Sequence, residues 1–185
     1  IDQLCNERDV LIVQSAGNLP LKGTPPFLGI ADHLTAGRDY PAYLVESSAR
    51  IANPGQSLQA LTVGSIVYDA AEQGAWRTFA TQPAGPSAFS RTGPGIWNVI
   101  KPEVVEYGGD AALSNNEPPD LQAGGVIPAA CPYLVRSTLY GPGPAADRDT
   151  AGTSYAVPKV ARIAAQIQRV LPAEPALLYR ALVVQ

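Results

Sequence analysis

The segment from Gly152 to Pro158 (GTSYAVP), which continues as KVARIAAQIQRVL, is the most informative part of the sequence. Thr153 or Ser154 would be the N-cap of a helix here, with a hydroxyl that accepts a hydrogen bond from an orphan backbone N–H. Pro158 lies one turn in, where losing a helical hydrogen bond costs about 3 kcal/mol, so helix stability does not explain it. The apolar residues recur at helical spacing and predict a buried helix: Val157, Val160, Ala161, Ala164, Ile167 and Leu171.

A serine at the start of a helix has two interpretations. The positive end of the helix dipole and the unpaired N–H groups can stabilise an oxyanion formed next to the Ser154 hydroxyl. Alternatively, Ser154 only caps the helix.

The full motif separates these interpretations. GTSYAVPKVA (residues 152–161) closely resembles the nucleophile motif of the subtilisin-like serine peptidases, G-T-S-x-[AS]-x-P-x-V-A. The resemblance implies that Ser154 is the nucleophile and that Thr153 belongs to the substrate-binding site. Lys159 stands where most members carry histidine, at a position that is not catalytic.

A second stretch carries polar residues to the end of a predicted strand. Residues 10–13 (VLIV) are apolar and β-branched, which is typical of a parallel strand buried on both faces. Ligand-binding residues lie at the carboxyl ends of such strands, although Gly17-Asn18 also fits a simple turn. VLIVQSAGN resembles the same peptidase family. That resemblance implies that Asn18 is the oxyanion-hole donor, typically worth about 3 kcal/mol, and that Ser15, Ala16 and Gly17 line the P1 pocket.

Three further segments resemble the family in the expected order: residues 59–66 against its "VIAVGAV" strand, residues 87–95 against "ASFSSVGP", and residues 99–105 against "KPDVVAPG". A short helix is predicted within residues 40–53. The resemblance implies a three-layer α/β/α fold with a mostly parallel sheet. Residues 1–185 would be only the C-terminal portion of that catalytic domain.

The family's mechanism needs an aspartate, a histidine, the asparagine and the serine, in that order along the chain, and this sequence holds only the last two. His33 has the wrong neighbours and follows Asn18, so we interpret it as a loop histidine rather than the general base. Lys159 is five residues past Ser154 and falls on another face of the helix. Without a base a serine hydroxyl is a weak nucleophile, so the chain alone is expected to be inactive.

Composition limits the other functions. The 185 residues carry a formal net charge of −3, which gives no indication of a nucleic-acid partner, and no apolar run reaches membrane-spanning length. No cofactor or metal motif is present. Glu103 and Glu106 are expected on a solvated loop face because calcium needs more oxygen ligands. Cys5 and Cys131 are expected to be small buried side chains. Residues 108–150 predict long loops with a hairpin around residues 133–140.

Two functional hypotheses remain. The chain is part of a subtilisin-like serine endopeptidase that acts on peptide or protein substrates, or it is a non-catalytic, subtilisin-derived peptide-binding or assembly domain. The first would need the missing N-terminal part of the same domain as a partner. Absence of the N-terminal strands would expose a sheet edge, which predicts a homodimer through that edge. The sequence gives no compartment.

Overall fold

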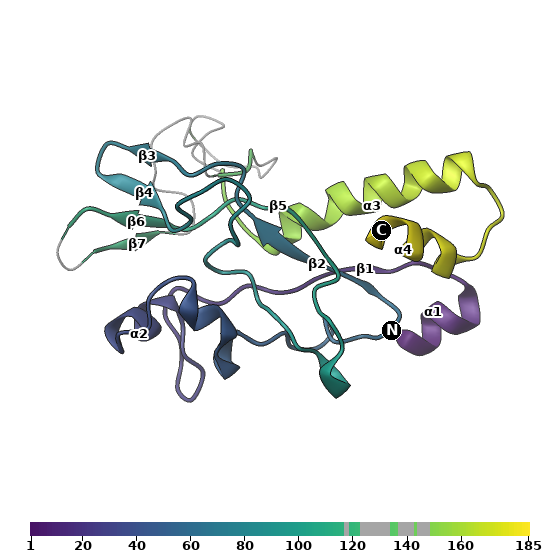
Figure 1. The fold of residues 1–185 in the computed structure, drawn as a ribbon, viewed down its shortest axis with the longest axis horizontal. Coiled ribbons are helices and arrows are strands. Elements are labelled where there is room, and N and C mark those ends of the chain that lie inside the picture. The colour runs from purple at the N-terminus through teal and green to yellow at the C-terminus, as the bar shows by residue number, and fades with distance from the viewer. Residues whose placement is uncertain (117–118, 123–133, 137–142, 144–148) are drawn as a thin grey trace.

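The computed structural model describes residues 1–116, 119–122, 134–136, 143 and 149–185 (Figure 1). The α-helices are α1 (Asp2–Arg8), α2 (Ile30–Thr35), α3 (Thr153–Val170) and α4 (Ala176–Val184), and the 3-10 helices are η1 (Ala42–Val45), η2 (Ser47–Ala49) and η3 (Ile96–Asn98). The strands are β1 (Val13–Ser15), β2 (Leu61–Ile66), β3 (Glu72–Gln73), β4 (Trp76–Thr78), β5 (Val104–Tyr107), β6 (Ala112–Ser114) and β7 (Leu121–Gln122). The mixed α/β class expected from the sequence is confirmed.

A parallel sheet with the order β1-β2-β5 forms the centre of the fold. Val13 pairs with Leu61, and Val63 pairs with Val104, so the three strands run in register with β2 in the middle. β2 is buried along nearly its whole length, as its apolar and β-branched sequence predicts. The first strand begins at Val13, later than the predicted residues 10–13, although the Ile12 carbonyl already accepts a bond from the Leu61 N–H.

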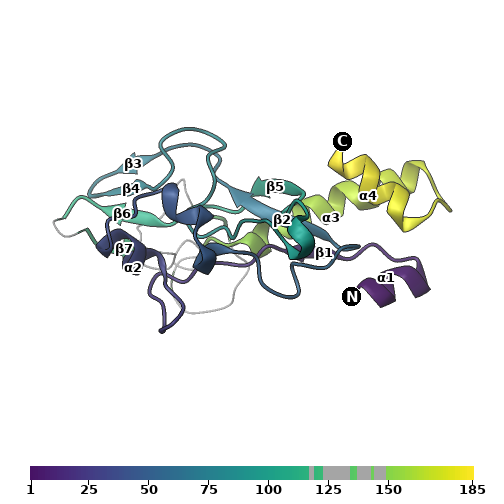
Figure 2. The same cartoon turned by 60° about the horizontal axis from the view of Figure 1, so that its bottom comes forward.

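Helix α3 covers one face of the parallel sheet. Ala156 and Val160 of α3 pack against Leu61 and Val63 of β2, which point to the same face because side chains alternate along a strand. Helix α4 packs beside α3 at the end of the molecule that also holds both termini (Figures 1 and 2). The predicted helices at residues 1–8 and at the C-terminus are therefore confirmed, and Asp9 ends α1 in the left-handed conformation.

Loop segments cover the opposite face of the sheet in the part of the chain that is described. The Thr62 hydroxyl donates to the Gly55 carbonyl, and a Cβ on Gly64 would come within 2.7 Å of Pro102 Cγ. Gly64 is therefore required for this close approach of a loop to the strand. Residues 40–53 form the short turns η1 and η2 in place of one predicted helix.

A second sheet, antiparallel with the order β3-β4-β6-β7, lies at the far end from α4 (Figures 1 and 2). This sheet was not predicted from the sequence, because its strands are only two or three residues long. Most of the hairpin predicted around residues 133–140 lies outside the described residues. The described flank contributes an antiparallel bridge between Val135 and Thr150. Cys131 also lies outside the described residues, whereas Cys5 is buried and free.

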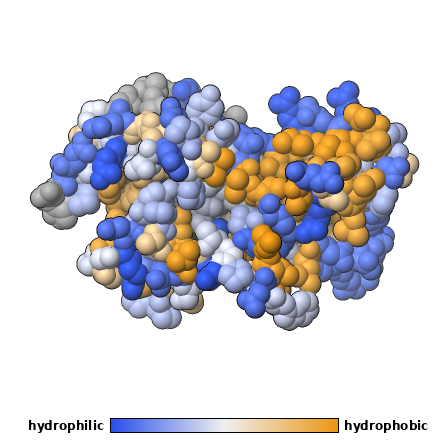
Figure 3. Space-filling model, in the orientation of Figure 1, coloured by the Kyte–Doolittle hydropathy of each residue, from blue (hydrophilic) through white to orange (hydrophobic). Residues whose placement is uncertain are grey.

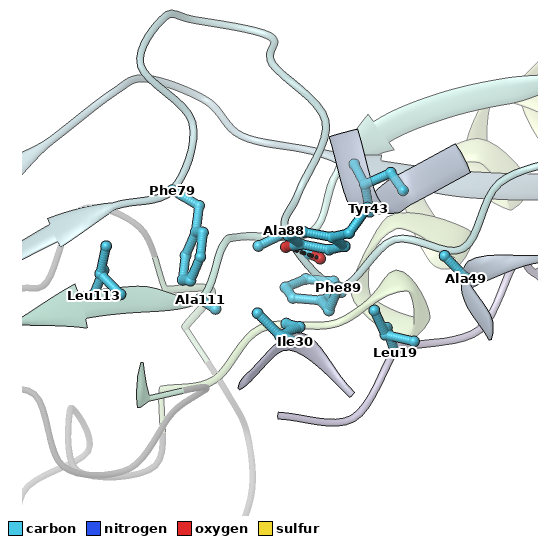
Figure 4. Packing of buried hydrophobic residues seen from close by; sticks show 10 residues of the cluster. Leu19, Ile30, Tyr43, Ala49, Phe79, Ala88, Phe89, Ala111 and Leu113 are labelled. Atoms are coloured by element: carbon cyan, nitrogen blue, oxygen red, sulfur yellow. Dashed lines mark hydrogen bonds between the residues drawn. The ribbon is translucent and has the colours of Figure 1, made fainter. Parts of the chain in front are cut away.

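An apolar core joins the antiparallel sheet to the segment around α2 and η1 (Figure 4). The Tyr43 ring is fully buried there and its hydroxyl donates to the Ala88 carbonyl at 2.8 Å. Figure 4 shows how side chains distant in sequence meet in this core. Its members are Leu19, Ile30, Tyr43, Leu44, Ala49, Phe79, Ala88, Phe89, Ala111 and Leu113.

Two glutamates differ from expectation. Glu103 does not lie on a solvated loop face: its side chain is 10% exposed and contacts both Lys101 Nζ and Arg180 Nη2 at 2.6 Å. The carboxylate bridges two cations, which explains how a charged group is buried here. Glu106 belongs to β5 and approaches Lys159 at 4.0 Å, so the expectation of a loop position was wrong for it as well.

Apolar side chains gather on one end of the surface, over the positions of α3 and α4 (Figure 3). The exposed large apolar side chains of these two helices are Ile163, Val170, Leu177 and Val184. A hollow of about 350 Å³ lies between β1 and these helices, lined by Val10, Leu11, Val13, Ala161, Ala164, Ala165 and Tyr179 among others. Within the described part of the chain, no helix is both long and apolar enough to cross a bilayer.

Candidate active site

Asn18 and Thr153 are 135 positions apart in sequence and in direct contact in the structure. The backbone N–H and the hydroxyl of Thr153 both donate to Asn18 Oδ1, at 3.0 and 2.9 Å. Asn18 follows β1, and Thr153 is the first residue of α3. The carboxyl end of β1 and the N-terminus of α3 therefore meet at this point.

The N-cap of α3 differs from the sequence expectation. Gly152 is the capping residue, not Thr153 or Ser154, and neither of these side chains caps the helix. The oxygen of the distant Asn18 replaces a local cap by accepting one of the orphan N–H groups. Tertiary contact thus satisfies a backbone group that local sequence patterns assign to a neighbouring hydroxyl.

The orientation of the Asn18 amide follows from these bonds. A backbone N–H can only donate, so the atom that faces Thr153 must be the oxygen and the NH2 group points away from it. Nδ2 lies 3.1 Å from the position that a Cβ on Gly152 would occupy, so glycine leaves room for the amide there. Nδ2 makes no hydrogen bond to any described residue. Two N–H donors are therefore available at an exposed position.

Ser154 follows Thr153 as the second residue of α3 and is exposed. Its N–H belongs to the first turn of the helix, where backbone donors have no helical acceptor. Within residues 1–116, 119–122 and 149–185, its hydroxyl has no hydrogen-bond partner and no base in contact. The local field favours negative charge, because α3 is 18 residues long and its positive end points here.

The residues before Asn18 form a fixed backbone wall. The Ala16 N–H donates to the Val63 carbonyl at 2.8 Å, and Ala16 is 2% exposed. Gly17 has a φ of +92°, a conformation that favours glycine. Ser15 ends β1. The three residues proposed from the sequence for substrate binding are therefore contiguous with Asn18 at the end of the strand.

A neighbouring segment, residues 89–91, holds this wall in place. The Leu19 N–H donates to the Phe89 carbonyl at 2.7 Å, and the Arg91 N–H donates to the Gly17 carbonyl at 3.1 Å. Asn18 forms an antiparallel bridge with Ser90 between these two bonds. Residues 87–95 resemble the family in sequence, but that pattern does not mark Arg91 as part of the site.

The Arg91 side chain crosses Gly17. A Cβ on Gly17 would meet Arg91 Cδ at 3.1 Å and Nε at 3.6 Å. Nη1 of Arg91 donates to the backbone carbonyls of Ser48 and Arg50, at 2.8 and 2.9 Å. Partial burial lowers the pKa of Arg91 from its ordinary value, although a guanidinium keeps its proton at any physiological pH.

His33 is a core residue. It lies on α2 rather than in the expected loop, and it is 1% exposed. Nε2 is 2.6 Å from the Ser48 hydroxyl and Nδ1 accepts a bond from Arg38 Nε at 3.2 Å. The ring stacks on Tyr43 with a centroid separation of 5.4 Å. Burial lowers the pKa of His33, which keeps the imidazole neutral in the core.

Lys159 is engaged away from Ser154. Its Nζ donates to the Tyr107 carbonyl at 2.7 Å and lies 5.6 Å from the centroid of the Tyr107 ring. These contacts agree with the expectation that Lys159 projects from a different face of α3 than Ser154. Among the described residues, no group of three or more His, Cys, Asp or Glu side chains forms a metal-binding cluster.

This α/β fold places Asn18, at the end of a parallel strand, against the first residue of α3, which immediately precedes Ser154. The model of the subtilase family matches residues 1–185, and the chain belongs to that family. It is 35% identical over 197 residues to an uncharacterized protein, y4bN, of Sinorhizobium fredii, with all of this chain matched and 42% of the relative. The chain therefore spans less than half of that relative's length. No solved structure is significantly similar to it.

Proposed function

We propose that this chain supplies the nucleophile and the oxyanion-binding half of a serine endopeptidase site. Ser154 Oγ attacks the scissile carbonyl carbon, and a base takes the hydroxyl proton and returns it to the leaving amine as the C–N bond breaks. Water then hydrolyses the acyl-Ser154 ester by the reverse sequence of proton transfers. Asn18 Nδ2 and the Ser154 N–H donate to the oxyanion in both steps.

The double hydrogen bond from Thr153 to Asn18 Oδ1 is the observation that carries this proposal. It fixes the amide with its NH2 group free, and a donor held before reaction stabilises developing charge without reorganisation. Thr153 is a positioning residue in this scheme. Ser15, Ala16 and Gly17 form the backbone wall beside the substrate's P1 residue.

The general base and its aspartate would come from a part of the same domain that precedes residue 1. In this proposal residues 1–185 are a partial catalytic domain, and the N-terminal part is its partner. The open hydroxyl of Ser154 and the 42% coverage of the relative support this arrangement. The substrate is a peptide or protein.

A non-catalytic peptide-binding or assembly domain is the second candidate. It is favoured by the lack of any base in contact with Ser154 among the described residues. It does not explain why the Asn18 amide is fixed with its donors free, because a binding domain gains nothing from aiming them at an oxyanion.

Fluorophosphonate labelling followed by intact-mass analysis tests the proposal. We expect no adduct on residues 1–185 alone and one adduct when an N-terminal part bearing the aspartate and histidine is supplied. Ser154→Ala should abolish the adduct. No adduct in either condition would support the binding domain, and an adduct on the isolated chain would require a base within these residues.

A further inference from the structure

The guanidinium of Arg91 is a half-buried cation that no described carboxylate neutralises. Its Nη1 bonds go to two neutral backbone carbonyls, of Ser48 and Arg50. By contrast, Lys101 and Arg180, which are also withdrawn from solvent, share the carboxylate of Glu103. Withdrawing a charge from water without a counter-charge is costly, so a half-buried cation fixed in this way would be stabilised by an anionic ligand at its open edge.

The free donors of Arg91 are also open to a ligand. Nε and Nη2 make no hydrogen bond to the described residues. Neither atom is fully buried, because Arg180 Nε is the one fully buried side-chain atom without a partner among the described residues. Nη1 is anchored by two carbonyls, which fixes the plane of the group. The remaining edge therefore presents Nε–H and Nη2–H side by side, the geometry that binds a carboxylate through two parallel hydrogen bonds.

The position of Arg91 brings its guanidinium close to one residue of a bound substrate. Arg91 pairs with Gly17 through its backbone and covers Gly17 with its side chain, one residue before Asn18. In the proposed function the Asn18 amide holds the carbonyl oxygen of the P1 residue. The P1 side chain branches from the carbon bonded to that carbonyl, so it is the substrate group nearest to the wall formed by Gly17 and Arg91.

We propose that Arg91 makes this site selective for substrates with an aspartate or glutamate at P1. The inference rests on the proposed function and specifies its substrate class. The carboxylate would accept hydrogen bonds from Nε and Nη2. Gly17 has no side chain, so it leaves space for the P1 carboxylate to reach the guanidinium. Arg91 is thus a specificity-determining residue, with no part in the bond-breaking steps.

The test compares P1 side chains of equal size with and without charge. The protein used is the complete domain, with residues 1–185 and the N-terminal part in one polypeptide. Peptides with Asp or Glu at P1 should show kcat/KM about 30-fold higher than matched Asn or Gln peptides, as hydrogen bonds between charged groups allow. Arg91→Gln should reduce this ratio to about 1, and Arg91→Lys should leave an intermediate ratio. Arg77→Gln, an exposed arginine in the antiparallel sheet, should keep the original ratio.

A binding measurement separates this inference from the proposed function. Peptides ending in Asp or Asn are titrated into the Ser154→Ala variant, where no reaction occurs, and selectivity for Asp should depend on Arg91. If Ser154 labels with fluorophosphonate but neither readout favours the acid, the proposed peptidase stands and the P1 inference is wrong. Equal ratios for the wild type and Arg91→Gln would also overturn it. Should Arg91→Gln fail to fold, the wild-type ratio and Arg91→Lys decide.

Discussion

Asn18 has two separate tasks at the scale of a single side chain. Its oxygen accepts two hydrogen bonds from Thr153 and so caps α3, while its nitrogen has no hydrogen-bond partner among the described residues. Aspartate keeps the acceptor and lacks the N–H donors, and alanine removes both. The two substitutions therefore separate the structural task from the proposed catalytic one.

We expect Asn18→Asp to unfold with a free energy within about 0.5 kcal/mol of the wild type, because a carboxylate also caps a helix. Asn18→Ala should lose about 1 kcal/mol. In the complete domain both variants should lower kcat by about 10² to 10³-fold, since neither can donate to the oxyanion. Urea unfolding and steady-state kinetics measure the two effects. An Asn18→Asp variant with wild-type kcat would show that the Asn18 amide has no role in the mechanism.

Asp110 is a second residue with an unusual environment. It is fully buried two residues before β6, where its carboxylate accepts bonds from the Ala80 and Ala88 N–H groups at 3.1 and 2.7 Å. Desolvation outweighs these bonds and raises the pKa of Asp110 from 3.8 to about 6. The folded state therefore binds this proton more tightly than the unfolded state.

The raised pKa of Asp110 predicts a pH-dependent stability. Its favourable contribution is complete below pH 3.8 and is lost as the pH rises through about 6, because the ionised form is penalised only in the folded state. The unfolding free energy of the wild type minus that of Asp110→Asn should fall over this interval and stay constant above it. Urea unfolding at a series of pH values measures the difference. A difference that does not change with pH would show that Asp110 has an ordinary pKa in the fold.

At the scale of elements, one carboxylate attaches α4 to the parallel sheet. Glu103 precedes β5 and accepts bonds from Arg180 of α4, from Lys101 and from the Thr62 N–H of β2. Removing the charge would leave two cations near each other without a counter-ion. Breaking a buried ion pair in this way is far costlier than losing an exposed one.

Glu103→Gln should therefore lower the free energy of unfolding by about 3 kcal/mol. Glu106→Gln, in the strand β5 that Glu103 precedes, is the matched control. Its partner Lys159 is 4.0 Å away and both side chains are more exposed, so the loss should not exceed about 1 kcal/mol. Chemical denaturation of both variants gives the comparison. Equal losses would mean that Glu103 is not the link between α4 and the sheet.

At the scale of the whole molecule, β1 pairs only with β2 among the described strands, so its other edge is free. The hollow of about 350 Å³ is lined in part by Val10, Leu11 and Val13, and apolar surface lies over α3 and α4 (Figure 3). A strand edge next to apolar surface is a template for pairing with another chain. In the proposed function this surface receives the N-terminal part of the domain.

In the absence of that part, we expect residues 1–185 to form a homodimer through the β1 edge. Light scattering coupled to size-exclusion chromatography should show a dimer that dissociates on dilution. Adding the N-terminal part should replace the dimer by a one-to-one complex. Gln14→Lys, which puts a charge on the edge strand, should weaken the dimer. A monomer over a wide range of concentrations would rule out pairing at this edge.

The predictable parts of the fold are those where local pattern and tertiary environment agree. The central strand at residues 61–66 and the helix from Thr153 have uniform periodicity over enough residues, and both were predicted. The two- and three-residue strands of the second sheet carry no such pattern, because their pairing is set by neighbours distant in sequence. Glu103 looked solvated for the same reason: its partner Arg180 is 77 positions away.

The α/β class, the family and the candidates Ser154 and Asn18 could be predicted before the structure, because they depend on residue identity in short motifs and on periodicity. The folded chain was needed to show that the Asn18 oxygen caps α3, that His33 is buried in a core, and that Arg91 lies over Gly17. Each of these is a contact between segments far apart along the chain. The direction of a hydrogen bond and the burial of a charge depend on which segments meet, and local pattern does not encode that.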